Sequence, residues 1–124
     1  LAIISAAQTG VPGLGVSGPN ALLSRQSFMP KLTQEQLNTL TFNIIPDRDI
    51  IAHIDDIARL SQRIRCNADV NDLLDCHSVE RTWCEIMYTC GSNGRPYICE
   101  CTTEYGYPVP IATGNRTFEE ACSG

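Results

Sequence analysis

A chain of 124 residues with a hydrophobic fraction of 43% is long enough for one compact unit and too apolar for a disordered segment. Nine basic and fourteen acidic residues give a formal net charge of −5 without a basic stripe, so nucleic acid is not expected as a partner. No apolar run reaches the roughly 18 residues of a membrane-spanning helix, so no transmembrane segment is expected.

The first half of the chain alternates between helical and extended patterns. In chain order, the segments are a helix over 1–8, a short buried strand over 14–17, a helical turn over 33–40 and a strand over 41–45. Gly10 ends the first helix, Thr33 caps the second, and Pro46 stops the second strand. Helix alternating with strand predicts an α/β fold with a parallel sheet.

The second half is less regular. Residues 54–66 fit either a helix that starts at Asp55-Asp56 or a short strand near their end. Apolar residues at helical spacing predict a helix after Ser78 that ends near Gly91, with Trp83 and Met87 on its buried face. Residues 97–101 predict a strand, and the two prolines after it predict an irregular tail.

All seven cysteines lie between Cys66 and Cys122, a pattern that predicts disulfides and an oxidising compartment. The glycosylation triplet Asn115-Arg116-Thr117 agrees with secretion. An odd number of cysteines leaves one thiol free or paired outside the chain. We favour one bridge, Cys66–Cys76, which closes the loop leading to His77, and the other pairings stay open.

Two residues are candidates for general acid–base chemistry. Asp49 follows the strand 41–45 on a loop, and loops at the carboxyl edge of a parallel sheet are where sites are built. His77 lies on the loop before a helix, where a general base would have the exposure that it needs. The residues alone favour solvated loop side chains over a catalytic pair. Asp47 and Arg48 are interpreted as solvated, and His53 as a structural, hydrogen-bonded histidine.

Other reactive patterns are weaker. Ser17 lies in a sequence similar to a nucleophile elbow, but Pro19 replaces its second glycine, so a loop serine is expected. A zinc site is conceivable, but the spacing lacks a C-x2-C pair and favours disulfides; its ligands would be Cys84, Cys90, Cys99, Cys101 and His77. The acidic residues of 47–56 do not form a calcium loop. No metal or cofactor is expected.

Three segments, in this order, carry a family likeness: Ser17-Gly18-Pro19, FNIIPDRDII over 42–51, and Asp75-Cys76-His77-Ser78. The order resembles fungal-type (class 3) lipases, which are secreted α/β-hydrolases with a Ser-His-Asp triad. The resemblance implies that Asp49, rather than Asp47, is the acid of the triad and that His77 is its base.

The likeness covers roughly residues 1–90 and implies the C-terminal part of a lipase-like α/β-hydrolase domain, followed by a cysteine-rich tail over 91–124. The opening LAIISAAQ resembles the helix that follows the nucleophile elbow, which implies that the chain begins just past the serine. The serine and the oxyanion hole would then lie in an upstream part of the same enzyme.

The leading hypothesis is therefore that the chain is part of a secreted lipase, which acts on a lipid ester of the triacylglycerol type at an interface. The fragment alone is expected to be inactive. The alternative is a non-catalytic, cysteine-rich extracellular binding or structural module on a lipase-derived scaffold. An upstream G-x-S-x-G sequence would favour the enzyme.

Overall fold

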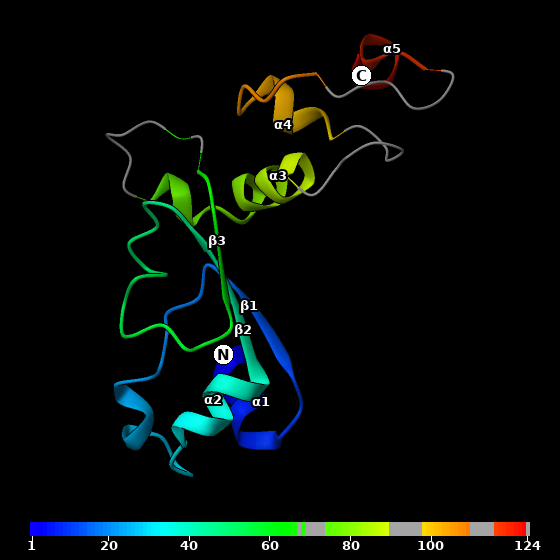
Figure 1. Ribbon diagram of the computed structural model, residues 1–124. Coiled ribbons are helices and arrows are strands. Elements are labelled where there is room, and N and C mark those ends of the chain that lie inside the picture. Colours follow the sequence, from blue (N-terminus) through cyan, green and yellow to red (C-terminus); the bar gives the residue numbers. More distant parts are fainter. Residues whose placement is uncertain (67, 69–73, 90–97, 110–115, 124) are drawn as a thin grey trace.

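The computed structural model describes residues 1–66, 68, 74–89, 98–109 and 116–123 (Figure 1). Its elements, in chain order, are α1 (Ala2–Thr9), β1 (Gly13–Val16), η1 (Ser24–Ser27), α2 (Gln34–Leu40), β2 (Thr41–Pro46), β3 (Ser61–Ile64), η2 (Asp75–His77), α3 (Val79–Thr89), α4 (Cys99–Thr103) and α5 (Phe118–Cys122). The predicted helices at 1–8 and 33–40 and the predicted strands at 14–17 and 41–45 are confirmed to within two residues.

Glycines that follow the first helix determine where α1 ends and how closely β1 packs against it. Gly10 closes α1 in the left-handed conformation, with φ of 77° and its N–H bonded to the carbonyl of Ala6. A Cβ on Gly13 would lie 2.6 Å from the Cβ of Ala6, so only glycine allows β1 to start this close to α1. Further along, Gly15 lies beside Ile3, so α1 runs antiparallel to β1.

A capping box starts the second helix. The Thr33 hydroxyl accepts the N–H of Gln36, and the Gln36 side chain accepts the N–H of Thr33. The helix then passes directly into β2, whose Thr41 hydroxyl donates to the carbonyl of Leu37. The predicted cap is therefore present at the start of α2, and the contact between Thr41 and Leu37 ties the start of β2 to the last turn of the helix.

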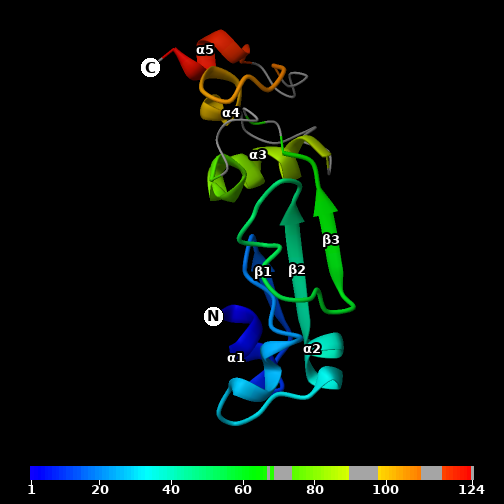
Figure 2. The same cartoon turned by 90° about the vertical axis from the view of Figure 1, so that its left-hand side faces the viewer.

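The described residues form a three-stranded parallel sheet in the order β1-β2-β3 (Figure 2). The strands point the same way, and α3 lies beyond their carboxyl ends. A hydrophobic cluster holds α1 and α2 to the connecting loops; its buried members are Ile3, Ala7, Ala21, Leu32 and Leu37. The α/β class with a parallel sheet is therefore confirmed.

The prediction of a helix starting at Asp55-Asp56 is wrong. Asp55 has φ of 66°, and the next regular element is the strand β3. The Asp55 carboxylate accepts hydrogen bonds from the N–H groups of Leu23 and Ser24, at 2.6 and 2.9 Å, and from the Ser24 hydroxyl at 2.6 Å. The side chain therefore holds another loop instead of capping a helix of its own, a contact across 31 residues that local sequence does not reveal.

Three disulfides join the described cysteines, and they indicate an extracellular or secretory-pathway protein. The predicted bridge Cys66–Cys76 is confirmed, and the other two are Cys84–Cys101 and Cys99–Cys122. Several predictions fall outside the described residues. They concern Cys90, the helix end at Gly91, the domain boundary at 90/91 and Asn115 of the glycosylation triplet. Among the helices that the structure describes, none combines the length and apolarity needed to cross a bilayer.

The strand predicted over 97–101 is wrong for its described part, because Cys99–Thr103 is the helix α4. Two residues apart on a strand, Cys99 and Cys101 would point to one face, whereas on a helix they point in nearly opposite directions. The helix lets Cys101 bond to Cys84 of α3 while Cys99 bonds to Cys122 of α5. The two pairings therefore fit a helix over these residues and do not fit a strand.

The buried face of α3 also differs in part from the prediction. Met87 is buried, but the side chain of Trp83 is 55% exposed. Cys84 and Glu85 turn inward instead, since Cys84 is bonded to Cys101 and Glu85 accepts the Tyr107 hydroxyl at 2.7 Å. These contacts with α4 and the segment after it rotate Trp83 towards solvent.

Candidate active site

Asp49 is fixed on the loop after β2. Its side chain is fully buried, at 0% exposure. One carboxylate oxygen, Oδ1, accepts the N–H of Ile51 at 2.9 Å and that of Ala52 at 3.3 Å. The loop itself turns back on the strand, because the N–H of Asp49 bonds to the carbonyl of Pro46. The carboxylate is therefore held by the backbone of its own loop and has little freedom to rotate.

His77 meets this carboxylate directly. Its Nδ1 lies 3.1 Å from Oδ2 and 3.2 Å from Oδ1 of Asp49. The side chain of His77 is 41% exposed, whereas that of Asp49 is fully buried. Within the part of the chain that the structure describes, Nε2 of His77 has no hydrogen-bond partner. The two residues paired in the sequence analysis are thus in contact, with the second ring nitrogen available.

Covalent and polar contacts fix the turn that carries His77. Cys76, the neighbouring residue, is buried and bonded to Cys66, two residues beyond β3. On the other side of His77, the Ser78 hydroxyl accepts the N–H of Arg81 at 3.2 Å and caps α3. Asp75 accepts from Nε of Arg81 at 2.6 Å. The histidine is therefore held between a disulfide and a capped helix.

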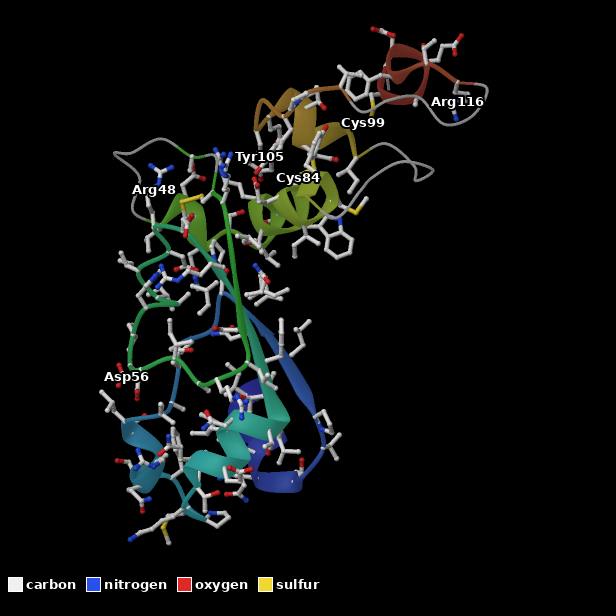
Figure 3. The ribbon with its side chains drawn as sticks, viewed as in Figure 1. Arg48, Asp56, Cys84, Cys99, Tyr105 and Arg116 are labelled. Carbon is white, nitrogen blue, oxygen red and sulfur yellow. A yellow bond between two sulfur atoms is a disulfide. The ribbon has the colours of Figure 1, made fainter. Side chains whose placement is uncertain are left out.

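Arg48 links the Asp49 loop to the segment after β3, a role that the sequence analysis missed. Its guanidinium donates to the carbonyls of Cys66 and Ala68, both at 2.9 Å, while the residue stays exposed to solvent as predicted. In Figure 3 it lies in the upper part of the molecule, where the strands end. No local pattern marks such a contact; a left-handed φ of 67° at Arg48 comes from the turn itself.

Chemically, the arrangement suits a general base. A carboxylate beside Nδ1 favours the tautomer with a proton on Nδ1, because that N–H then donates to the carboxylate. Nε2 is left as the proton acceptor on the exposed part of the ring. The contact also stabilises the imidazolium once Nε2 has taken a proton.

Ser17 does not take part in this contact. It follows β1 at the same edge of the sheet, but its side chain is only 4% exposed, and its hydroxyl lies 3.4 Å from that of Thr82 on α3. A nucleophile must reach a substrate, so burial under α3 agrees with a structural serine. His53 is hydrogen-bonded as expected, with Nδ1 2.7 Å from the carbonyl of Asp49.

The candidate zinc ligands are used in other bonds. Cys84, Cys99 and Cys101 are all in disulfides, and disulfide sulfur is not a thiolate ligand. Across the described ranges, no group of three or more His, Cys, Asp or Glu side chains is placed to hold a metal ion.

Comparison with models of protein families found no match, and comparisons with curated proteins and with solved structures found no significant similarity.

Proposed function

We propose that Asp49 and His77 are the acid and the base of a Ser-His-Asp triad in a secreted lipase of the class 3 type, with an α/β-hydrolase fold. Its substrates would be carboxylic esters of lipids, of the triacylglycerol type. The observation that carries the proposal is the contact of 3.1 Å between a fully buried carboxylate and Nδ1 of a half-exposed histidine. A solvated pair of loop residues would not bury its carboxylate in this way.

The position of the pair supports the proposal. Asp49 lies three residues after β2, and the disulfide Cys66–Cys76 brings the turn of His77 to the segment after β3. Both residues are therefore at the carboxyl edge of neighbouring parallel strands, where sites in open α/β sheets are built.

In the proposed reaction, Nε2 of His77 takes the proton of a serine hydroxyl while the serine oxygen attacks the ester carbonyl. Asp49 holds the ring by its Nδ1 proton and stabilises the positive charge. The tetrahedral intermediate collapses when His77 gives its proton to the leaving alcohol, and an acyl-enzyme remains. Water then repeats the sequence through the same base, which releases the carboxylic acid and restores the serine.

We place the nucleophile in a segment preceding Leu1. Among the described residues, no serine hydroxyl contacts His77. Because α1 runs antiparallel to β1, its first residues lie towards the carboxyl end of the strand, as Ile3 beside Gly15 illustrates. A serine just before α1 would therefore approach the edge that carries Asp49 and His77. The oxyanion-hole donors would come from outside this chain as well.

The test is ester hydrolysis by the chain extended with its upstream segment. His77→Ala and Asp49→Asn should each lower kcat by about 10⁴-fold, because the base is lost or held in the wrong tautomer. Asp47 is exposed and lies two residues before Asp49. Asp47→Asn therefore removes the same charge outside the site, and kcat should stay unchanged. Circular dichroism should show that all three variants fold.

Unchanged turnover in the His77 or the Asp49 variant would contradict the assignment. The 124-residue chain alone should show no esterase activity. Turnover by that chain, blocked by a serine-directed phosphonate, would place the nucleophile within it.

The alternative is a non-catalytic, cysteine-rich extracellular binding or structural module on a lipase-derived scaffold. It predicts that the extended chain is inactive even with both residues intact. The same assay therefore separates the two functions.

A further inference from the structure

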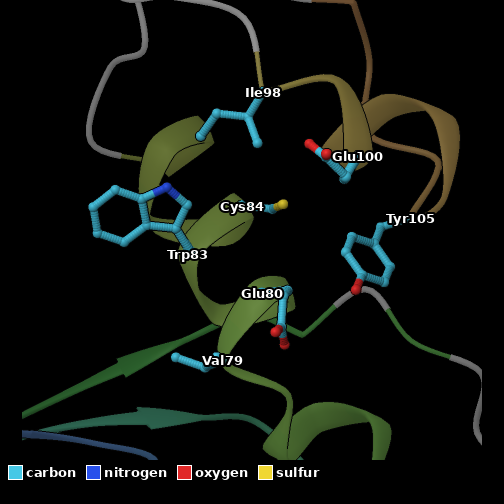
Figure 4. Close-up of a pocket in the computed structure, with 7 residues that line it drawn as sticks. All are labelled: Val79, Glu80, Trp83, Cys84, Ile98, Glu100 and Tyr105. Atoms are coloured by element: carbon cyan, nitrogen blue, oxygen red, sulfur yellow. The ribbon is translucent and has the colours of Figure 1, made fainter.

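A groove outside the candidate active site lies between α3 and α4 (Figure 4). Its volume is about 270 Å³, its walls are largely apolar, and its lining includes Val79, Glu80, Trp83, Ile98, Glu100 and Tyr105. Figure 4 shows Trp83 and Tyr105 on opposite sides of this α3–α4 groove, with the two glutamates at its two ends. Aromatic rings and carboxylates around one small cavity suit an organic cation.

The aromatic rings are suited to a positive charge. The face of an aromatic ring is electron-rich and attracts ammonium and guanidinium groups, with tryptophan the most effective. Tyr105 already has such a contact, since the guanidinium carbon of Arg81 lies 4.6 Å from its ring centroid. Trp83 is 55% exposed, so its ring remains accessible from solvent.

The two glutamates give the groove a negative character. The pKa of Glu80 is lowered, first by a hydrogen bond to its own backbone N–H and then by one from the Ser78 hydroxyl, so Glu80 is ionised at neutral pH. Glu100 is exposed, and its carboxylate has no partner among the described residues. The positive charge of Arg81 is offset by its ion pair with Asp75. A ligand that reaches the groove therefore meets a net negative charge.

Exposed apolar side chains on the same helix face point to a surface ligand rather than a free metabolite. Val79 and Trp83 are one helical turn apart and are 62% and 55% exposed. Tryptophan is enriched where lipid headgroups meet the hydrocarbon layer, because its ring is apolar while its N–H can bond to water. With a net charge of −5, the protein should be repelled by an anionic lipid surface.

We propose that the α3–α4 groove binds the quaternary ammonium of choline-type headgroups and so docks the protein on a zwitterionic lipid surface. The ammonium lies against the ring of Trp83, Glu80 and Glu100 supply the opposite charge, and Val79 enters the interface beside Trp83. This docking does not depend on the ester hydrolysis proposed above, because binding is measured without turnover.

The experiment uses the only tryptophan of the chain as its probe. The oxidised protein is titrated with vesicles of phosphatidylcholine and, separately, of phosphatidylglycerol with the same acyl chains. Phosphatidylcholine should shift the emission of Trp83 to shorter wavelength, and phosphatidylglycerol should not. Glu100→Gln should weaken binding to phosphatidylcholine about fivefold, the size expected for one exposed charge pair.

Glu104→Gln is the matched control, because this exposed residue lies just beyond α4 and outside the groove. It should bind like the unaltered protein, and both variants should keep their helical circular dichroism. Equal binding of the two lipids, or equal effects of the two glutamate variants, would overturn the proposal. If the emission of Trp83 shifted to shorter wavelength with rising protein concentration and no lipid, Trp83 would be covered by self-association, and the docking proposal would be overturned.

Discussion

The sheet region, residues 1–64, and the helical region, which the structure describes at 74–89, 98–109 and 116–123, are stabilised in different ways. In the sheet region a cluster of apolar side chains joins α1, α2 and the loops, and its described part contains no disulfide. In the helical region the buried cluster is small, centred on Cys84, Cys101 and Tyr107, and disulfides join α3, α4 and α5. The helical region therefore depends on covalent links where the sheet region depends on burial.

The candidate active site lies where these two regions meet. Asp49 belongs to the sheet region, His77 precedes the first helix of the other, and Cys66–Cys76 joins the two beside the histidine. Rigid placement of His77 thus requires both kinds of stabilisation. Changes that weaken one region selectively will show how independent the two are.

Reduction of the disulfides should have the largest effect. Cys84–Cys101 and Cys99–Cys122 close segments of 17 and 23 residues, and loops of this size stabilise a fold by about 3 kcal/mol each. After reduction and thiol blocking, hydrogen exchange in α3 and α4 should become much faster, while α1 and β2 stay protected. The variant Cys84→Ala with Cys101→Ala tests one bridge alone. Equal loss of protection in β2 would show that the regions unfold together.

Leu37→Ala should weaken the sheet region by about 3 kcal/mol. The Leu37 side chain is fully buried in the hydrophobic cluster, so its truncation removes apolar contacts and leaves a cavity. Urea unfolding followed by circular dichroism measures the change in the free energy of unfolding. Leu23→Ala, at an exposed leucine, is the control and should change it by less than about 0.5 kcal/mol. A smaller loss for Leu37→Ala than for the control would refute the role of burial here.

Asp55→Asn should have the smallest effect, about 1 kcal/mol at neutral pH after allowance for solvent exposure. Burial raises the pKa of Asp55, but hydrogen bonds from the Ser24 hydroxyl and from the backbone of Leu23, Ser24 and Asp56 outweigh it, so the pKa lies below 3.8. Because the pKa of Asp55 is lower in the folded protein than in the unfolded chain, the ionised carboxylate stabilises the fold at every pH above the pKa of the unfolded chain. This stabilisation disappears as the pH falls through the folded pKa.

The measurement for Asp55 is the free energy of unfolding at neutral and at acidic pH. The difference between the unaltered protein and Asp55→Asn should shrink as the pH drops below 3.8. Asp56→Asn, at the exposed neighbour, should show little difference at either pH. A difference for Asp55→Asn that grows in acid would mean that the sign of the shift is wrong.

The sequence by itself determined the local features of this protein. Gly10 at the end of α1, the capping box at Thr33 and the β-branched run of β2 act over a few residues, so composition and spacing predicted them. The same short-range logic placed Asp49 on a loop after a strand and His77 before a helix. Cys66 and Cys76, which close a short loop, were paired from sequence as well.

Only the tertiary structure decided which surfaces are covered and which side chains meet. Asp55 holds a loop 31 residues away, and Trp83 faces solvent because Cys84 and Glu85 face inward. Residues 99–103 form a helix that directs Cys99 and Cys101 to different partners. The contact between Asp49 and His77 likewise spans 28 residues. Periodicity predicts an element, but burial and bonding depend on its neighbours, and these are set by the fold as a whole.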